Sequence, residues 1–270
     1  MIAPKMFMGL MALVLALPAQ GQGDFQRAHT AFTSYWFKTL QARPNDVTGR
    51  ERVHDSGLRL HEQVVNRLTP AILDYLNSPR RFSLSDLKER LSRVLTAPTM
   101  GNVTAKGVAD AVSVNNGKTV FVAYTVDYCI VCSKAWLGKF VFQDGKFDLQ
   151  WSTDSVAAGH AVHLVLVGNG SSTAIALYGV QWGDPHNHLG LWMFSSEASE
   201  PEPIWSLYRP EGDVSFAGNK IVVSSDTEPT QFGGPPDFRQ REIFQLSDNH
   251  VELIRRSISK TPVHSLPANN

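Results

Sequence analysis

Apolar residues in the first hundred positions recur at helical spacing. Phe25, Phe32 and Trp36 lie seven and four residues apart, which places them on one face of a helix over about 24–41. A later break is expected at Thr69-Pro70, because threonine caps helices and proline is favoured in the first turn. Similar spacing, interrupted by Pro, Asn and Ser, predicts three further helices, which cover residues 49–67, 69–76 and 83–95.

After Val108 the pattern changes to short runs of β-branched and aromatic residues that alternate with polar ones. Gly, Asn, Asp and Pro separate these runs, as is typical of strands joined by turns. The first run of each unit recurs after about 50 residues, at 112–114, 164–167 and 214–216. Each unit is expected to add three more strands, at 119–125, 135–142 and 147–151, at 173–180, 189–194 and 204–208, and at 220–225, 241–246 and 251–256.

Three units of four meandering strands resemble the blades of a β-propeller, whose repeats have about this length. Three blades are too few to close a propeller, and the period alone does not separate a propeller-like fragment from a twisted β-sandwich. We therefore predict an α+β chain in which a small helical bundle precedes a mainly antiparallel β domain. The domains are expected at 22–100 for the helices and 108–257 for the β-repeats, and a polar tail at 258–270 is expected to be disordered.

The first 21 residues have the pattern of a secretory signal peptide. Lys5 precedes an apolar run from Met6 to Leu17, and small residues follow at Ala19-Gln20-Gly21. Twelve apolar residues are too few to span a bilayer, which needs about 20. We therefore expect a mature protein that is periplasmic or secreted, without a transmembrane segment, in a compartment where disulfides persist.

Composition narrows the class of protein. The chain has 270 residues, 43% of them apolar, and no formal net charge, which excludes a disordered protein and argues against a nucleic-acid binder. Charge is uneven, because residues 22–107 hold 13 Lys and Arg against 8 Asp and Glu, whereas residues 108–270 hold 11 against 17. A basic face for anionic partners is one interpretation, and docking of the basic half on the acidic half is the one we favour.

One edge of the predicted meanders gathers the residues with the most chemistry. In a four-strand meander, the loop between strands two and three opens on the same edge as the link to the next unit. These loops and links hold Cys129 and Cys132 in the first unit and four histidines around the second. The histidines are His160, His163, His186 and His188.

Three interpretations of Cys129 and Cys132 are open. A thioredoxin-like site places its Cys-x-x-Cys at a helix N-terminus, whereas this motif lies between strands. A zinc site would need histidine partners at a spacing that matches no usual zinc finger. A disulfide that closes the loop in an oxidising compartment is the interpretation we favour.

His186 and His188 alternate along an extended segment, so both imidazoles can lie on one face and hold Zn²⁺ or Cu²⁺. Asp184 and His160 are the further candidate ligands. The other interpretation of these residues is a polar loop beside Pro185. We expect no cofactor, with the metal as the alternative.

Other polar residues have simpler explanations. His54 and His61 are seven apart and share a helix face, where a solvated surface or an ordinary hydrogen-bonded partner is the favoured interpretation over metal or proton chemistry. Carboxylates such as Asp144 and Asp154 are explained by turns. No nucleophile-elbow or phosphate-loop pattern is present.

Aromatic residues complete the predicted loop edge. Trp182, Phe232 and Phe238 lie in or beside the same loops as His186 and His188, and aromatic-lined loops on β scaffolds bind sugars, peptides or proteins. We therefore expect a non-catalytic binding or interaction module that uses this edge for a protein or carbohydrate ligand. The alternative is a metal-binding protein or metal-dependent hydrolase, and a homodimer is one way to cover the open edges of three units.

Overall fold

Three helices and twelve strands make up the described part of the chain. The computed structural model describes residues 20–41, 47–97, 107–127, 133–154, 162–169, 173–181, 187–227, 238–248 and 250–260. The helices are α1 (Gln20–Gln41), α2 (Val47–Leu76) and α3 (Leu84–Val94). None of these helices is long and apolar enough to cross a bilayer.

The predicted break at Thr69-Pro70 is wrong, because α2 continues through Pro70 to Leu76. A proline inside a helix removes one hydrogen bond and costs about 3 kcal/mol. Pro70 is exposed, but the adjacent Leu68, Ala71 and Ile72 are fully buried against the core. Packing of these three side chains offsets the cost of the proline, so one long helix replaces the two expected.

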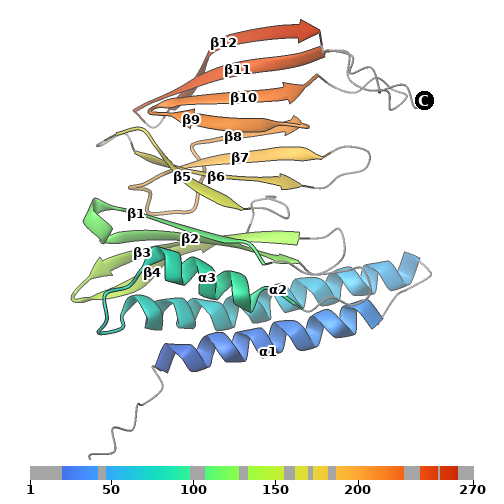
Figure 1. The fold of residues 1–270 in the computed structure, drawn as a ribbon, viewed down its shortest axis with the longest axis vertical. Coiled ribbons are helices and arrows are strands. Elements are labelled where there is room, and N and C mark those ends of the chain that lie inside the picture. Colours follow the sequence, from blue (N-terminus) through green and yellow to red (C-terminus); the bar gives the residue numbers. More distant parts are fainter. Residues whose placement is uncertain are drawn as a thin grey trace, which may run out of the picture.

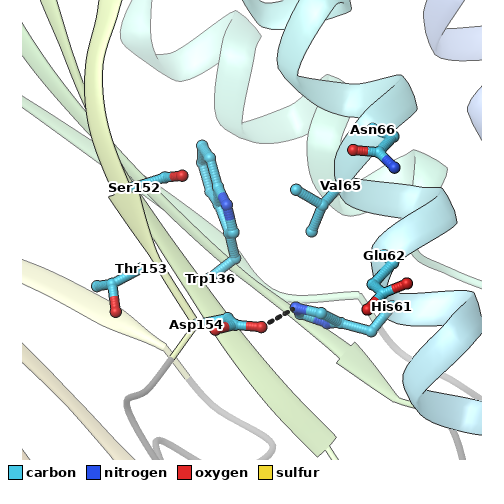
Figure 2. Close-up of a pocket in the computed structure, with 8 residues that line it drawn as sticks. All are labelled: His61, Glu62, Val65, Asn66, Trp136, Ser152, Thr153 and Asp154. Carbon is cyan, nitrogen blue, oxygen red and sulfur yellow. Dashed lines mark ion pairs between the residues drawn. The ribbon is translucent and has the colours of Figure 1, made fainter.

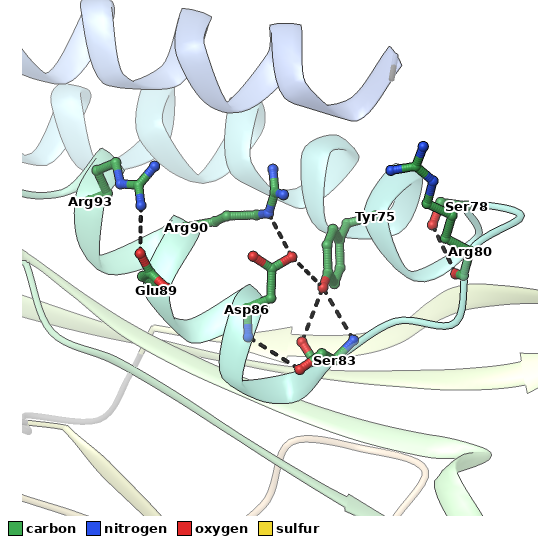
Figure 3. A network of polar contacts seen from close by, with 8 residues as sticks. All are labelled: Tyr75, Ser78, Arg80, Ser83, Asp86, Glu89, Arg90 and Arg93. Atoms are coloured by element: carbon green, nitrogen blue, oxygen red, sulfur yellow. Dashed lines mark hydrogen bonds and ion pairs between the residues drawn. The ribbon is translucent and has the colours of Figure 1, made fainter. Parts of the chain in front are cut away.

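Polar contacts join the end of α2 to the start of α3 (Figure 3). The Ser83 side chain accepts a hydrogen bond from the backbone N–H of Asp86, which makes Ser83 the N-cap of α3. The Tyr75 hydroxyl donates to Asp86 over 2.7 Å, and Arg90 Nε donates to the same carboxylate over 2.9 Å. The turn between α2 and α3 is therefore stabilised by side chains from both helices.

The three predicted repeats are confirmed as three four-strand antiparallel sheets. Each sheet is a meander in which strands consecutive in the chain are neighbours. The first sheet contains β1 (Ala109–Val114), β2 (Thr119–Asp127), β3 (Ser133–Gln143) and β4 (Lys146–Thr153). The second contains β5 (His163–Val167), β6 (Ala174–Gln181), β7 (His188–Ser195) and β8 (Trp205–Pro210). The third contains β9 (Asp213–Ala217), β10 (Lys220–Asp226), β11 (Phe238–Ser247) and β12 (His250–Lys260).

The sheets are stacked in chain order, and the helices cover the free side of the first sheet (Figure 1). The arrangement is open and does not close into a propeller. β12 continues through Lys260, so its last three residues lie in the segment expected as a tail. Residues 1–19 and 261–270 lie outside the described residues, and the signal peptide and the domain boundaries stay predictions.

The hydrophobic core is divided into layers by the sheets. Val122, Tyr124 and Trp136 of the first sheet pack with the helices. Their neighbours Phe121 and Ala123 point the other way and pack on the second sheet. β2 is buried from Thr119 to Val126, because successive side chains alternate between these two layers. The other face of the second sheet packs on the third through residues that include Ala176, Leu191, Ile221 and Phe244.

Each boundary between layers also has polar contacts. Between the helices and the first sheet, the Asn77 amide donates to the carbonyl oxygen of Phe147 and accepts from its N–H, over 2.9 and 2.6 Å. Between the first and second sheets, Lys139 Nζ and Trp151 Nε1 both donate to the carbonyl oxygen of Ala198, over 2.8 and 3.0 Å. These contacts fix how the layers lie relative to one another.

Between the second and third sheets lies a buried carboxylate. Glu242 on β11 is fully buried and accepts hydrogen bonds from Arg209 on β8 and Arg256 on β12, at shortest distances of 2.7 Å each. Burial raises the pKa of Glu242, but the hydrogen bonds from the two guanidinium groups outweigh burial and hold this pKa below its ordinary value.

We expect Glu242→Gln to lower the free energy of unfolding by about 2 kcal/mol at pH 7, because two cations lose their buried partner. The contribution of Glu242 is complete above its unfolded pKa of about 4.5 and is lost as the pH falls through its lower folded pKa. Urea denaturation at pH 7 and pH 3 tests this. Arg255→Gln, at an exposed position on β12, is the control and should change stability by less than about 0.5 kcal/mol. Equal stability of Glu242→Gln and the unmodified protein at pH 7 would contradict the prediction.

Candidate functional site

A cavity of about 340 Å³ lies between α2 and the strands β3 and β4 of the first sheet. α2 supplies one wall of the cavity, and β3, β4 and the residue after β4 supply the other (Figure 2). We call it the His61 pocket, after its most deeply buried polar residue. Its lining residues are His61, Glu62, Val65, Asn66, Trp136, Ser152, Thr153 and Asp154.

The periodicity of α2 carries His61 into the core. His61 lies three residues before Val64 and seven before Leu68, and both of these are fully buried on the inner face of the helix. His61 is therefore on the same face, and only 1% of its surface is exposed. The residue that follows it, Glu62, is exposed at the mouth of the pocket.

Antiparallel pairing of β3 with β4 brings a cation and an anion to the other wall. Lys134 is the second residue of β3, and Asp154 directly follows β4. The register pairs Leu137 with Thr153, so the start of one strand lies beside the end of the other. Lys134 Nζ lies 2.6 Å from Asp154 Oδ2.

The imidazole of His61 has no hydrogen bond within the described residues. Its Nε2 lies 3.5 Å from Asp154 Oδ2, which is close enough for an electrostatic contact (Figure 2). Neither ring nitrogen makes a hydrogen bond to any described residue, although both are buried. A buried polar group in this state costs about 1–3 kcal/mol.

Burial lowers the pKa of His61 to about 4, and the ammonium of Lys134 adds to this effect. Asp154 opposes it to a smaller extent. Burial raises the pKa of Asp154, but the hydrogen bond from Lys134, the positive charge of Lys134 and smaller contributions together outweigh burial and hold this pKa below its ordinary value. At neutral pH the pocket therefore contains a neutral imidazole beside an ionised Asp154–Lys134 pair.

The apolar wall of the pocket is held in place by stacking. The indole of Trp136 stacks on the ring of Tyr124 with 4.8 Å between ring centroids. Gly138, two residues along β3, has no side chain, and a Cβ at this position would collide with the indole. The glycine thus allows Trp136 to lie flat along its own strand.

Most of the predicted site residues lie outside the described residues. These are Cys129, Cys132, His160, Trp182, Asp184, His186 and Phe232. The disulfide and the His160, Asp184 and His186 ligand set therefore stay predictions. No group of three His, Cys, Asp or Glu side chains that could hold a metal ion occurs in the described part of the chain.

The structure does describe His188 and Phe238. His188 begins β7 and stacks on Tyr208 with 4.8 Å between ring centroids, and its buried Nδ1 has no hydrogen-bond partner among the described residues. Phe238 begins β11 and is 44% exposed. The two residues lie on different sheets.

The sequence gives no functional role to the residues of the His61 pocket. From the sequence, His61 is expected on a solvated helix surface or with an ordinary hydrogen-bonded partner, whereas the structure buries it without a hydrogen-bond partner among the described residues. Asp154 is explained in the sequence by a turn. The spacing of His61 from Val64 and Leu68 indicates that His61 is buried, because residues three and seven apart lie on the same face of a helix. Nothing local to Asp154 or Lys134 indicates that they meet.

Comparisons with known proteins provide no identification. No family model matches the chain, and no curated protein matches it. Among solved structures, it is similar to acylaminoacyl peptidase of Pyrococcus horikoshii in its orthorhombic crystal form, with 12% sequence identity and a TM-score of 0.24. The match covers 53% of this chain and 31% of that chain. A TM-score this low carries no argument about fold or function.

The lowered pKa of His61 predicts a pH-dependent stability. Between about pH 6.5 and pH 4 the unfolded chain binds a proton at this residue that the folded chain does not, so stability falls as the pH falls. We expect His61→Gln to lose about 2 kcal/mol less than the unmodified protein between pH 7.5 and pH 5. Urea denaturation at both pH values measures this. An NMR titration that gives a pKa near 6.5 for His61, or equal losses for the two proteins, would contradict it.

Proposed function

We propose that the chain is an exported, non-catalytic binding module and that the His61 pocket is its ligand site. The observation that carries the proposal is His61 itself. A side chain with 1% of its surface exposed lines a cavity, and its two nitrogens have no hydrogen-bond partner among the described residues. A bound ligand would supply those partners.

The energetics support a functional reason for a histidine at this position. The same helix face holds Val64 and Leu68, so an apolar residue would fit the local pattern. Natural proteins keep locally unfavourable residues where function needs them. The free energy lost in burying the imidazole is regained when a ligand makes hydrogen bonds to it.

Binding is better supported than catalysis by the charge states in the pocket. A general base works best with a pKa near the operating pH. The pKa of His61 is lowered to about 4, which makes the imidazole a weak base at neutral pH. Asp154 already accepts a hydrogen bond from Lys134, so it is partly committed to an ion pair.

The His61 pocket lies at the edge of the first sheet at which the sequence predicts the loop between β2 and β3, one of the loops expected to bind a ligand. Lys134 follows residues 128–132 almost directly, and Asp154 begins the link between the first and second units. In Figure 1, β2, β6 and β10 end on the same side of the stack, which is the side from which the links between second and third strands start. Contacts of a larger partner with Trp182, Phe232 and Phe238, the aromatic residues that the sequence predicts at the loop edge, are part of the proposal.

The proposal predicts a trade-off at His61. We expect His61→Leu to raise the free energy of unfolding by about 1 kcal/mol, because a buried polar group without partners is removed, and to lose the bound ligand. The test is native mass spectrometry of the exported protein, followed by denaturation and identification of any released small molecule. His250→Leu is the matched control, since His250 is exposed and lies on the third sheet.

Two results would contradict the proposal. One is a ligand-free spectrum for the protein taken directly from its exported fraction, together with no binding by any class of small molecule offered in solution. The other is a strong loss of stability in His61→Leu, which would show that the imidazole has a structural role.

A further inference from the structure

The charges around the His61 pocket limit which ligands it can bind. An inference about the class of ligand rests on the function proposed above, in which this pocket is the ligand site. Among the residues that the structure describes, the lining contains two carboxylates, Glu62 and Asp154, and no Lys or Arg. Lys134 is not among these lining residues, and its ammonium forms an ion pair with Asp154 Oδ2, the atom that also lies near His61 Nε2. The third ionisable residue of this described lining is His61.

An anionic ligand is disfavoured by this set of charges. Its negative group would approach the carboxylates of Glu62 and Asp154. Lys134, a cation close to the pocket, already donates to Asp154 over 2.6 Å. Like charges at this range repel, and the low dielectric of a partly enclosed pocket strengthens the repulsion.

A cationic ligand is disfavoured at the buried end of the pocket. The carboxylate oxygen Asp154 Oδ2, which lies near His61 Nε2, is already in contact with the ammonium of Lys134. At the imidazole, the effect of Lys134 outweighs that of Asp154, so added positive charge is unfavourable there. A ligand ammonium would have to displace Lys134 or lie beside it.

A hydroxyl group fits where a charged group does not. The neutral imidazole of His61 presents one donor and one acceptor, and a hydroxyl also donates once and accepts. Asp154 retains acceptor capacity beyond its bond to Lys134, because a carboxylate has about four acceptor positions. Asn66 and Ser152 add an amide and a hydroxyl to the lining, and Trp136 and Val65 add apolar surface for C–H groups.

We infer that the His61 pocket binds a neutral, polyhydroxylated ligand, a sugar ring or a small polyol, with one hydroxyl at the His61 imidazole and another at Asp154. The cavity of about 340 Å³ has the size of a site for a single small molecule. The apolar face of a sugar ring would lie toward Trp136 and Val65, and its hydroxyls toward the polar residues of α2 and β4.

The test uses the full mature chain and three kinds of probe. The neutral probes are D-glucose, D-galactose, D-mannose and myo-inositol, the cation is ethanolamine, and the anion is acetate. Each is titrated while the ring resonances of His61 are followed by NMR, assigned by comparison with His61→Gln. We expect at least one neutral probe to shift these resonances saturably, and ethanolamine and acetate at the same concentrations to leave them unchanged.

Variants separate the role of hydrogen bonding from that of space. His61→Phe, which keeps a ring but removes both the donor and the acceptor, is expected to weaken binding of the neutral probe about tenfold, measured by calorimetry. His61→Gln restores one donor and one acceptor and should recover most of the affinity. His250→Phe, the same ring exchange at an exposed position on β12 of the third sheet, is the control and should bind as the unmodified protein does.

The outcomes distinguish this inference from the function proposed above. Saturable shifts with ethanolamine or acetate and none with the neutral probes would overturn the ligand class and leave a binding module in place. Equal affinity of His61→Phe and the unmodified protein for the neutral probe would place that probe elsewhere and overturn the inference. A silent His61 with all six probes would also overturn it.

Discussion

The fold depends on one constraint, which is that the first two sheets are apolar on both faces. A strand such as β2, buried from Thr119 to Val126, cannot have one side in water, so each of its faces must be covered by another layer. The helices cover one face of the first sheet, the second sheet covers the other, and the third covers the second. The third sheet differs, because only alternate residues of β10 are buried. Its outer face bears Lys220, Ser224 and other polar residues, so the stack can end there.

Apolar layers alone would leave the stacked elements free to slide, and the polar contacts at each boundary oppose this. They join specific atoms, as at Asn77, whose amide pairs with the backbone of Phe147 as a neighbouring strand would. The Ala198 carbonyl and the Glu242 carboxylate each accept hydrogen bonds from two side chains across or along a boundary. Hydrophobic burial is not directional, whereas hydrogen bonds require defined geometry. Orientation of the layers is therefore set by a small number of buried polar groups.

The sheets can be predicted from the sequence better than the site, because strands depend on neighbouring residues whereas the site depends on residues far apart in the chain. Alternation and turn residues are local, so the twelve strands, the period and the cap at Ser83 could be predicted from short segments. The helix break expected at Pro70 does not occur, because tertiary packing of Leu68 and Ile72 outweighs the local preference of proline to interrupt a helix. The site joins His61 on α2 to Lys134 and Asp154 on β3 and β4, and no pattern along the chain links positions so far apart. His61 could have been placed in the core from its interval to Leu68, but the ion pair it faces depends on strand register.

The position of the cavity follows from the same constraint that organises the layers. A sheet packs well on a sheet because both are extended and share a twist, and the boundary between the first two sheets is filled by side chains such as Phe121 and Leu164. A helix is roughly cylindrical, so it contacts a sheet over a narrower strip than a second sheet does. The distance between the helix surface and the sheet increases on either side of that strip. Near the ends of β3 and β4 the space beside α2 is lined by polar residues instead of being filled by apolar ones. A binding site in this fold is therefore best accommodated where helix and sheet diverge, since polar groups there replace core packing that the geometry could not complete.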